Sequence, residues 1–177
     1  MTSVSLNSWM MLARKRLLSM VVLGVSLSLA AATAGTFPIP RSGTVFHGES
    51  AVLLTRQCSR IALAPVTGVW EPAAAQIAAL EPKLADLLAV KLASRSDIGF
   101  MAADFYRQYG GLLVGRRKII YVNGFHRELI DAQMGTGHIT NWHTVPVQVC
   151  DGGALTFGVE YDPATGRFAN FAFSGTI

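Results

Sequence analysis

The stretch VPVQVCDGGALTFGVEYDPATGRFANFAFSG, residues 145–175, decides the fold, because apolar residues alternate along it on both sides of a turn sequence. Such alternation predicts β-strands with one buried side, since successive side chains of a strand point to opposite faces. Asp162-Pro163-Ala164-Thr165-Gly166 favours a chain reversal, because it combines a turn initiator, a fixed φ and a glycine. The stretch therefore predicts antiparallel strands, the last over residues 167–173. The alternating apolar positions are Val145, Val147 and Val149, then Leu155, Phe157, Val159 and Tyr161.

A second hairpin is predicted upstream. Residues 104–114 and 118–124 are rich in strand-forming side chains and flank Gly115-Arg116-Arg117. Gly110 and Gly111 predict a bulge or a bend in the first of these strands. The basic triplet at residues 116–118 is interpreted as the solvated tip of the hairpin.

Residues 72–92 predict an amphipathic helix, because their large apolar side chains recur at helical spacing. Pro72 fits the first turn, and Pro82 predicts a kink or a restart near Glu81, since an internal proline removes a hydrogen bond. The apolar face comprises Ile77, Leu80, Leu84, Leu87, Leu88 and Leu92.

The remaining segments are less regular. Residues 35–48 predict an extended arm, residues 60–69 a connector, and residues 97–101 a hinge. Residues 50–58 fit either a short helix capped by Ser50 or a first strand. Residues 125–144 form a long connection without a clear period, which is typical of a functional or mobile loop.

Together these elements predict one α+β domain over residues 49–177, with one kinked amphipathic helix packed on an antiparallel meander of about five strands. The element order is that of a roll, and cystatin-like and nuclear-transport-factor-like folds are the nearest architectures by analogy.

The start of the chain predicts export. Arg14-Lys15-Arg16 precedes an apolar run to about Ala32, and Ala32-Thr33-Ala34 fits a small-residue cleavage site. We expect residues 1–34 to be a signal peptide cleaved near Ala34, leaving a periplasmic or secreted protein. An uncleaved membrane anchor is the alternative, although the run is short for a span.

Export also explains the basic charge. The chain has 15 basic and 11 acidic side chains, three basic ones lie at residues 14–16, and no acid precedes Glu49, so the mature net charge is 12 − 11 = +1. This balance argues against a nucleic-acid partner. We expect contact with a membrane only through the export signal.

Cys58 and Cys150 are the two cysteines of the chain. In an oxidising compartment a lone pair predicts a disulfide. The alternatives are a reactive thiol or a pair of metal ligands, but neither cysteine has Cys-x-x-Cys spacing.

Five segments of the chain together resemble a set of small exported bacterial proteins with no assigned activity. They are WEPAAAQIAALE, YRQYGGLLV, RRKIIYVNGF, VCDGG and FGVEYDPATGRF. The resemblance covers most of the mature chain and implies a secreted single domain. It transfers no catalytic or binding residue.

Three histidines of the long connection, His126, His138 and His143, are the side chains best suited to a metal or general-base site. Their spacing matches no metal motif, so we predict neither a metal nor a cofactor. Asp151 could mark a ligand-binding mouth or a turn that brings Cys150 to Cys58. Glu160 and Asp162 are expected to be solvated beside the hairpin turn.

Aromatic side chains suggest a binding surface. If Tyr106 and Tyr121, with Arg107 or Asn123, line the open side of the sheet, they suit a protein partner or a small apolar ligand. We therefore predict a non-enzymatic binding or interaction domain, with a small hydrolase or metal enzyme using His126, Glu128, His138 or His143 as the alternative. The candidate binding residues are Tyr106, Tyr121, Asn123, His126, His138, Trp142, His143 and Asp151.

Overall fold

The computed structural model describes residues 40–60, 63–95, 99–130, 139 and 141–175. The chain divides into the units Met1–Ala34 and Gly35–Ile177, and all described residues belong to the second. The expected signal peptide, residues 35–39 of the expected arm and His138 therefore lie outside the described residues.

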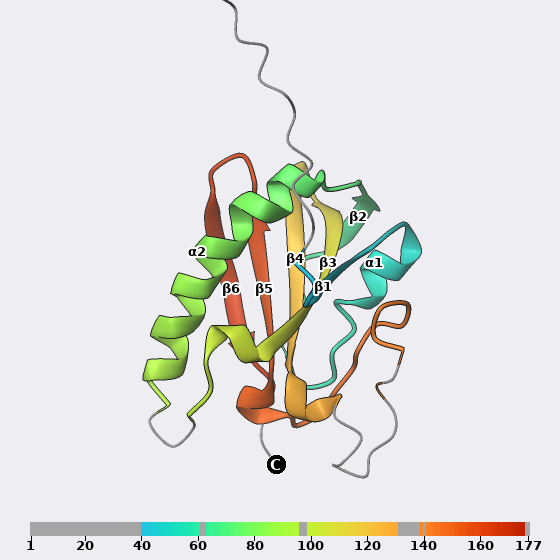
Figure 1. Ribbon diagram of the computed structural model, residues 1–177. Helices are drawn as coiled ribbons and strands as arrows, with labels where there is room; N and C mark the ends of the chain where they lie inside the picture. Colours follow the sequence, from blue (N-terminus) through green and yellow to red (C-terminus); the bar gives the residue numbers. More distant parts are fainter. Residues whose placement is uncertain (1–39, 61–62, 96–98, 131–138, 140, 176–177) are drawn as a thin grey trace, which may run out of the picture. The chain divides into compact units, whose positions relative to one another are not determined.

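The domain is α+β, with a mostly antiparallel open sheet and one main helix (Figure 1). The sheet has six strands in the order β1-β3-β4-β5-β6, and β2 pairs with β3 beside this path. The predicted fold class is confirmed at this level. The strands are β1 (Gly43–Phe46), β2 (Val66–Val69), β3 (Phe105–Val114), β4 (Arg117–His126), β5 (Thr156–Asp162) and β6 (Arg167–Phe173); the helices are α1 (Glu49–Leu53) and α2 (Ala74–Ala93).

The hairpin of β3 and β4 is confirmed, and the two strands pair without a register shift from Phe105↔His126 to Val114↔Arg117. Of the bulge or bend predicted at Gly110 and Gly111, the bulge is therefore absent from this strand pair. These glycines instead allow close packing: a Cβ on Gly111 would lie 2.1 Å from the Trp70 carbonyl oxygen, and one on Gly110 would lie 3.0 Å from the Ala51 side chain.

The hairpin of β5 and β6 is also confirmed. Gly166 takes a φ of 68° in the turn, and Asp162 Oδ1 accepts hydrogen bonds from the backbone of Ala164 and Thr165. The register shifts between Gly158 and Glu160, an irregularity that no sequence pattern predicts.

The first third of the described chain is more ordered than predicted. Part of the expected arm forms β1, which pairs in parallel with β3, and part of the expected connector forms β2. Residues 49–53 adopt the helical alternative, but the residue before the helix is Gly48 and not Ser50.

The alternating segment 145–149 is not a strand, so that part of the prediction is wrong. It has no regular secondary structure, and its apolar alternation partly survives, with Val147 buried and Val145 54% exposed. Side chains, not a neighbouring strand, satisfy its central residue: the Val147 carbonyl accepts from Gln57 and Asn123, and its N–H donates to Gln108. Burial at alternate positions can therefore arise without a neighbouring strand that pairs with the backbone.

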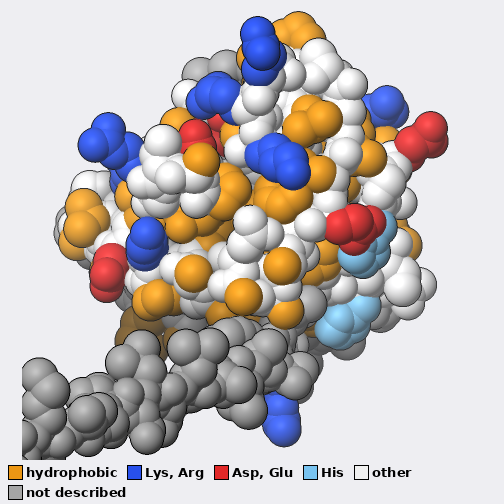
Figure 2. Space-filling view, turned by 90° about the horizontal axis from the view of Figure 1, so that it is seen from above, with side chains coloured by type: hydrophobic (Ala, Val, Ile, Leu, Met, Phe, Trp, Pro, Cys, Tyr) orange, Lys and Arg blue, Asp and Glu red, His pale blue; other side chains and the backbone are white. Residues whose placement is uncertain are grey.

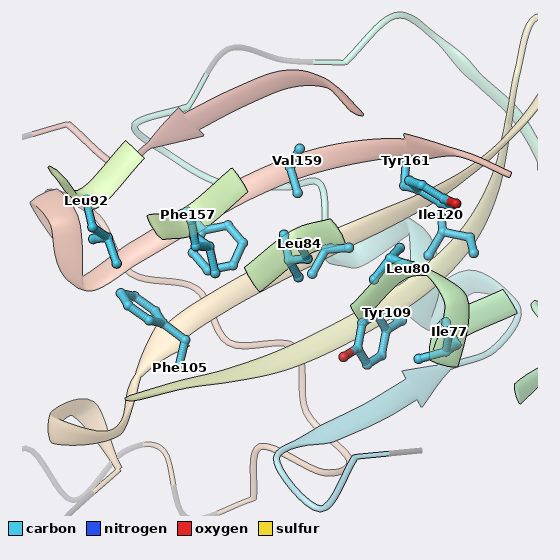
Figure 3. Close-up of a cluster of buried hydrophobic side chains, with 12 residues drawn as sticks. Ile77, Leu80, Leu84, Leu92, Phe105, Tyr109, Ile120, Phe157, Val159 and Tyr161 are labelled. Atoms are coloured by element: carbon cyan, nitrogen blue, oxygen red, sulfur yellow. The ribbon is translucent and has the colours of Figure 1, made fainter. Parts of the chain in front are cut away.

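The main core lies between α2 and one face of the sheet (Figure 3). The helix is continuous through Pro82, so the predicted restart does not occur, while its axis bends along its length in Figure 1. Burial of five side chains at helical spacing confirms the predicted apolar face. They are Ile77, Leu80, Leu84, Leu88 and Leu92, and they pack with Phe105, Tyr109, Ile120, Val122, Phe157, Val159 and Tyr161.

The opposite face of the sheet is covered in part by α1 and by residues 141–149, which form two smaller apolar clusters with it. The predicted disulfide is present: Cys58 is bonded to Cys150, with 5.4 Å between their Cα atoms. It joins the segment after α1 to the residue that follows segment 145–149. Within the described ranges, no helix has the length and apolar character required to cross a membrane.

Candidate functional site

A buried polar network lies on the sheet face opposite α2. Gln108 on β3 and Asn123 on β4 are directly paired across the strands and are 0% and 1% exposed. Asn123 Nδ2 donates to Gln108 Oε1 at 3.0 Å, and Gln108 Nε2 donates to the carbonyls of Trp142 and Val145. Because buried polar groups are costly without partners, this network holds residues 142–147 against the sheet.

A pocket of about 380 Å³ opens beside this network. Its walls combine apolar side chains with one cationic and one anionic side chain. We call it the sheet-face pocket, and its lining residues are Arg60, Leu63, Tyr121, Gly158, Glu160, Asn170, Phe171 and Ala172.

Arg60 enters this pocket from the segment after the disulfide. Its Nη2 donates to Asn123 Oδ1 at 2.7 Å, and its Nη1 donates to the Tyr121 hydroxyl at 3.2 Å. Gly158 leaves the space for this arrangement, since a Cβ there would lie 2.4 Å from Arg60 Nη1. Burial lowers the pKa of Arg60, because removal from water disfavours the charged guanidinium.

Glu160 of β5 is directly paired with Tyr121 of β4. It is 4% exposed, although the sequence predicted a solvated carboxylate, so that prediction is wrong. Its Oε1 accepts a hydrogen bond from Asn170 Nδ2, and Asn170 stands at the irregular part of β6 with a φ of 52°. Burial raises the pKa of the Tyr121 hydroxyl, which Arg60 opposes and Glu160 reinforces.

The structure brings three of the predicted aromatic and amide residues to one sheet face. Tyr106, Tyr121 and Asn123 share the face opposite α2, as expected, but other parts of the chain cover much of it. Tyr106 packs against Trp142, with 4.9 Å between their ring centroids. Arg107 points the other way, where its Nε lies 3.5 Å from Glu81 Oε1 of α2.

The described histidines of the long connection do not share a site. His126 is 1% exposed and stacks on Phe100 on the α2 side of the sheet. His143 is exposed and lies against Trp142 on the opposite side. In the described part of the chain, no three histidine, cysteine or acidic side chains are grouped as a metal site requires.

Asp151 is exposed and has a φ of 57°, and its backbone N–H donates to the Ser59 hydroxyl at 3.3 Å. It therefore belongs to the turn that follows Cys150 and packs near Cys58. This placement favours the structural interpretation of Asp151 over a ligand-binding mouth.

Sequence reasoning missed Arg60, Gln108 and Glu160, the polar residues on which the network and the pocket depend. Gln108 and Arg60 stand among residues that gave no motif, and Glu160 stood next to a turn. The alternation of β3 could have identified Gln108, because it places a polar amide between Tyr106 and Gly110 on one face.

The surface does not gather charge of one sign on the face seen from above. There, Lys and Arg side chains are spread out, with apolar and acidic side chains between them (Figure 2). The hairpin tip of residues 115–118 is exposed, as predicted.

Comparisons with protein-family models, with curated proteins and with solved structures found no match for this chain.

Proposed function

We propose that this protein is an exported, non-enzymatic binding domain whose small ligand occupies the sheet-face pocket. The pocket volume of about 380 Å³ falls within the range of roughly 300 to 1,000 Å³ that is usual for small-molecule sites. Leu63 and Ala172 offer apolar contacts, and Arg60 and Glu160 add polar groups that can orient a ligand.

The state of Arg60 carries this proposal. Its guanidinium is largely withdrawn from water, yet it forms no ion pair with a described acidic residue and donates to two neutral oxygens. Its buried Nε has no hydrogen-bond partner in the described chain. Buried charges in folded proteins are normally paired, so an arginine of this kind beside a pocket favours a ligand that compensates it.

Export is part of the same proposal. The disulfide between Cys58 and Cys150 supports an oxidising compartment, and the basic and apolar start of the chain supports a signal peptide. We place the activity in the periplasm or outside the cell. The element order, one main helix followed by the antiparallel strands β3 to β6, also supports a roll of the cystatin-like or nuclear-transport-factor-like type.

Binding is favoured over catalysis because the predicted catalytic groups are dispersed. A hydrolase or metal enzyme using the loop histidines requires them to converge, whereas His126 and His143 lie on opposite sides of the sheet. A docking partner on the sheet face is also less favoured, because α1 and residues 141–149 cover part of that face.

The proposal is tested with 1-anilinonaphthalene-8-sulfonate, an apolar fluorescent anion. We expect one molecule to bind the oxidised protein and Ala172→Phe to prevent this, because residue 172 lines the pocket. Ala164→Phe adds the same ring at the exposed hairpin turn and should leave binding unchanged. Near-ultraviolet circular dichroism verifies that both variants are folded. Equal binding to the two variants, or no binding to the unmodified protein, would refute a pocket function.

A further inference from the structure

The sheet-face pocket holds two opposite charges apart. Arg60 and Glu160 both line it, and these two described residues form no ion pair with each other. Tyr121 adjoins both: its hydroxyl accepts from Arg60, and its strand position is directly paired with Glu160. The pocket therefore presents a cation and an anion at separate points.

Internal hydrogen bonds keep the two charges separate. Arg60 would lose its bonds to Tyr121 and Asn123 if it swung toward the carboxylate. Glu160 would lose its bond from Asn170, which is set by the irregular backbone of β6. Since each side chain is held by a neutral partner, neither charge is compensated by the other within the protein.

Both groups retain hydrogen-bonding capacity. A guanidinium has five N–H donors, and Arg60 donates two hydrogen bonds to described residues. A carboxylate has about four acceptor positions, and Glu160 uses Oε1 for Asn170. A ligand with a carboxylate and an ammonium group can therefore be recognised at both ends, and its apolar part can contact Leu63 and Ala172.

We propose that the ligand of the sheet-face pocket is a small zwitterion with an apolar side chain, such as a free apolar α-amino acid, whose carboxylate faces Arg60 and whose ammonium group faces Glu160. This inference rests on the proposed binding function and specifies its ligand class. The two charges act as opposite ends of one recognition site, and the apolar wall selects the side chain.

The test uses four related compounds: L-phenylalanine, its amide, its N-acetyl derivative and the N-acetyl amide. These carry both charges, the positive charge, the negative charge and neither charge. Each is titrated against the oxidised protein in the presence of 1-anilinonaphthalene-8-sulfonate, and its displacement of the probe is measured. We expect L-phenylalanine to displace the probe at least tenfold more effectively than each singly charged compound, because a hydrogen bond to a charged group contributes roughly tenfold or more in affinity.

Two variants assign the charges. Glu160→Gln keeps an oxygen for Asn170 and should remove the preference for the free amine while keeping that for the free carboxylate. Arg60→Met should remove the preference for the carboxylate. Because the compound series is compared first on the unmodified protein, a misfolded variant does not prevent a decision.

The outcomes separate the two proposals. Probe binding that Ala172→Phe does not affect would refute the pocket function itself. Probe binding in the pocket with equal displacement by all four compounds, with no displacement by any of them, or with preference for one singly charged compound, would leave the pocket function standing and refute the zwitterion.

Discussion

Replacement of Gln108 by Met is the sharpest test of the buried polar network. The Gln108 side chain is 0% exposed and takes part in four hydrogen bonds, to Trp142 O, Val145 O, Val147 N and Asn123 Nδ2. Methionine has a similar length but forms none of these bonds. The substitution therefore removes the hydrogen bonds that hold residues 142–147 and leaves the side-chain volume nearly the same.

The expected loss of unfolding free energy follows from these bonds. At about 1 kcal/mol net for each hydrogen bond, four bonds correspond to about 4 kcal/mol. Val145 is 54% exposed, so water can replace the bond to its carbonyl, and we expect a loss of about 3 to 4 kcal/mol. The free energy of unfolding of a native protein is about 5 to 15 kcal/mol in total, so the expected loss is a large part of it.

The assay is urea unfolding of the oxidised protein, monitored by tryptophan fluorescence and by circular dichroism. The dependence of the unfolding free energy on urea concentration is compared between variants. Gln148→Met is the matched control, because Gln148 is exposed and makes one bond, to the Arg56 carbonyl at 2.8 Å. It should cost less than about 1 kcal/mol. If the Gln108 and Gln148 variants lose the same small amount of unfolding free energy, segment 145–149 is not held by the buried polar network.

Three further outcomes are expected. Replacing Cys58 and Cys150 by Ser removes a cross-link over a sequence separation of 92, which should lower the unfolding free energy by about 4 to 5 kcal/mol by the chain-entropy relation; equal denaturation midpoints for oxidised and Ser-substituted protein would contradict this. Gly111→Ala should destabilise the domain by more than about 2 kcal/mol because its Cβ would overlap a backbone carbonyl, whereas Gly99→Ala, with open space around it, should be nearly neutral in thermal unfolding. Burial first, and then the nearby Glu81, raises the pKa of Tyr109 well above its ordinary value of 10.0; the unfolded chain therefore releases this proton first, so stability should fall as pH rises above about 10, with a shallower slope in Tyr109→Phe.

Much of the fold follows from the sequence because its periodic signals are local. The Leu face of α2 and the alternation of β3 to β6 depend on which side chains an element must bury. The parallel strand β1 was missed, since four residues beside a proline-rich stretch carry no period that could reveal a partner more than 60 residues away. Segment 145–149 was misjudged for a related reason: alternation reports burial on one side, and it does not report what pairs with the backbone.

The candidate site was predicted less well than the fold. Tyr121 and Asn123 were identified from their strand and face, but the charges that give the pocket its chemistry come from Arg60 and Glu160. Their importance arises from three elements that meet only in the folded chain, and the backbone irregularity at Asn170 has no sequence signal strong enough to locate it.

The way in which residues 145–149 are held limits how evolution can change their length. Connecting segments usually accept added or deleted residues, and a strand in a ladder can slide by two positions and pair again. This segment meets single amide side chains at fixed points, so adding even one residue would present the wrong backbone groups to all of them. Length variation among relatives of this chain should therefore be confined to places outside this short crossing.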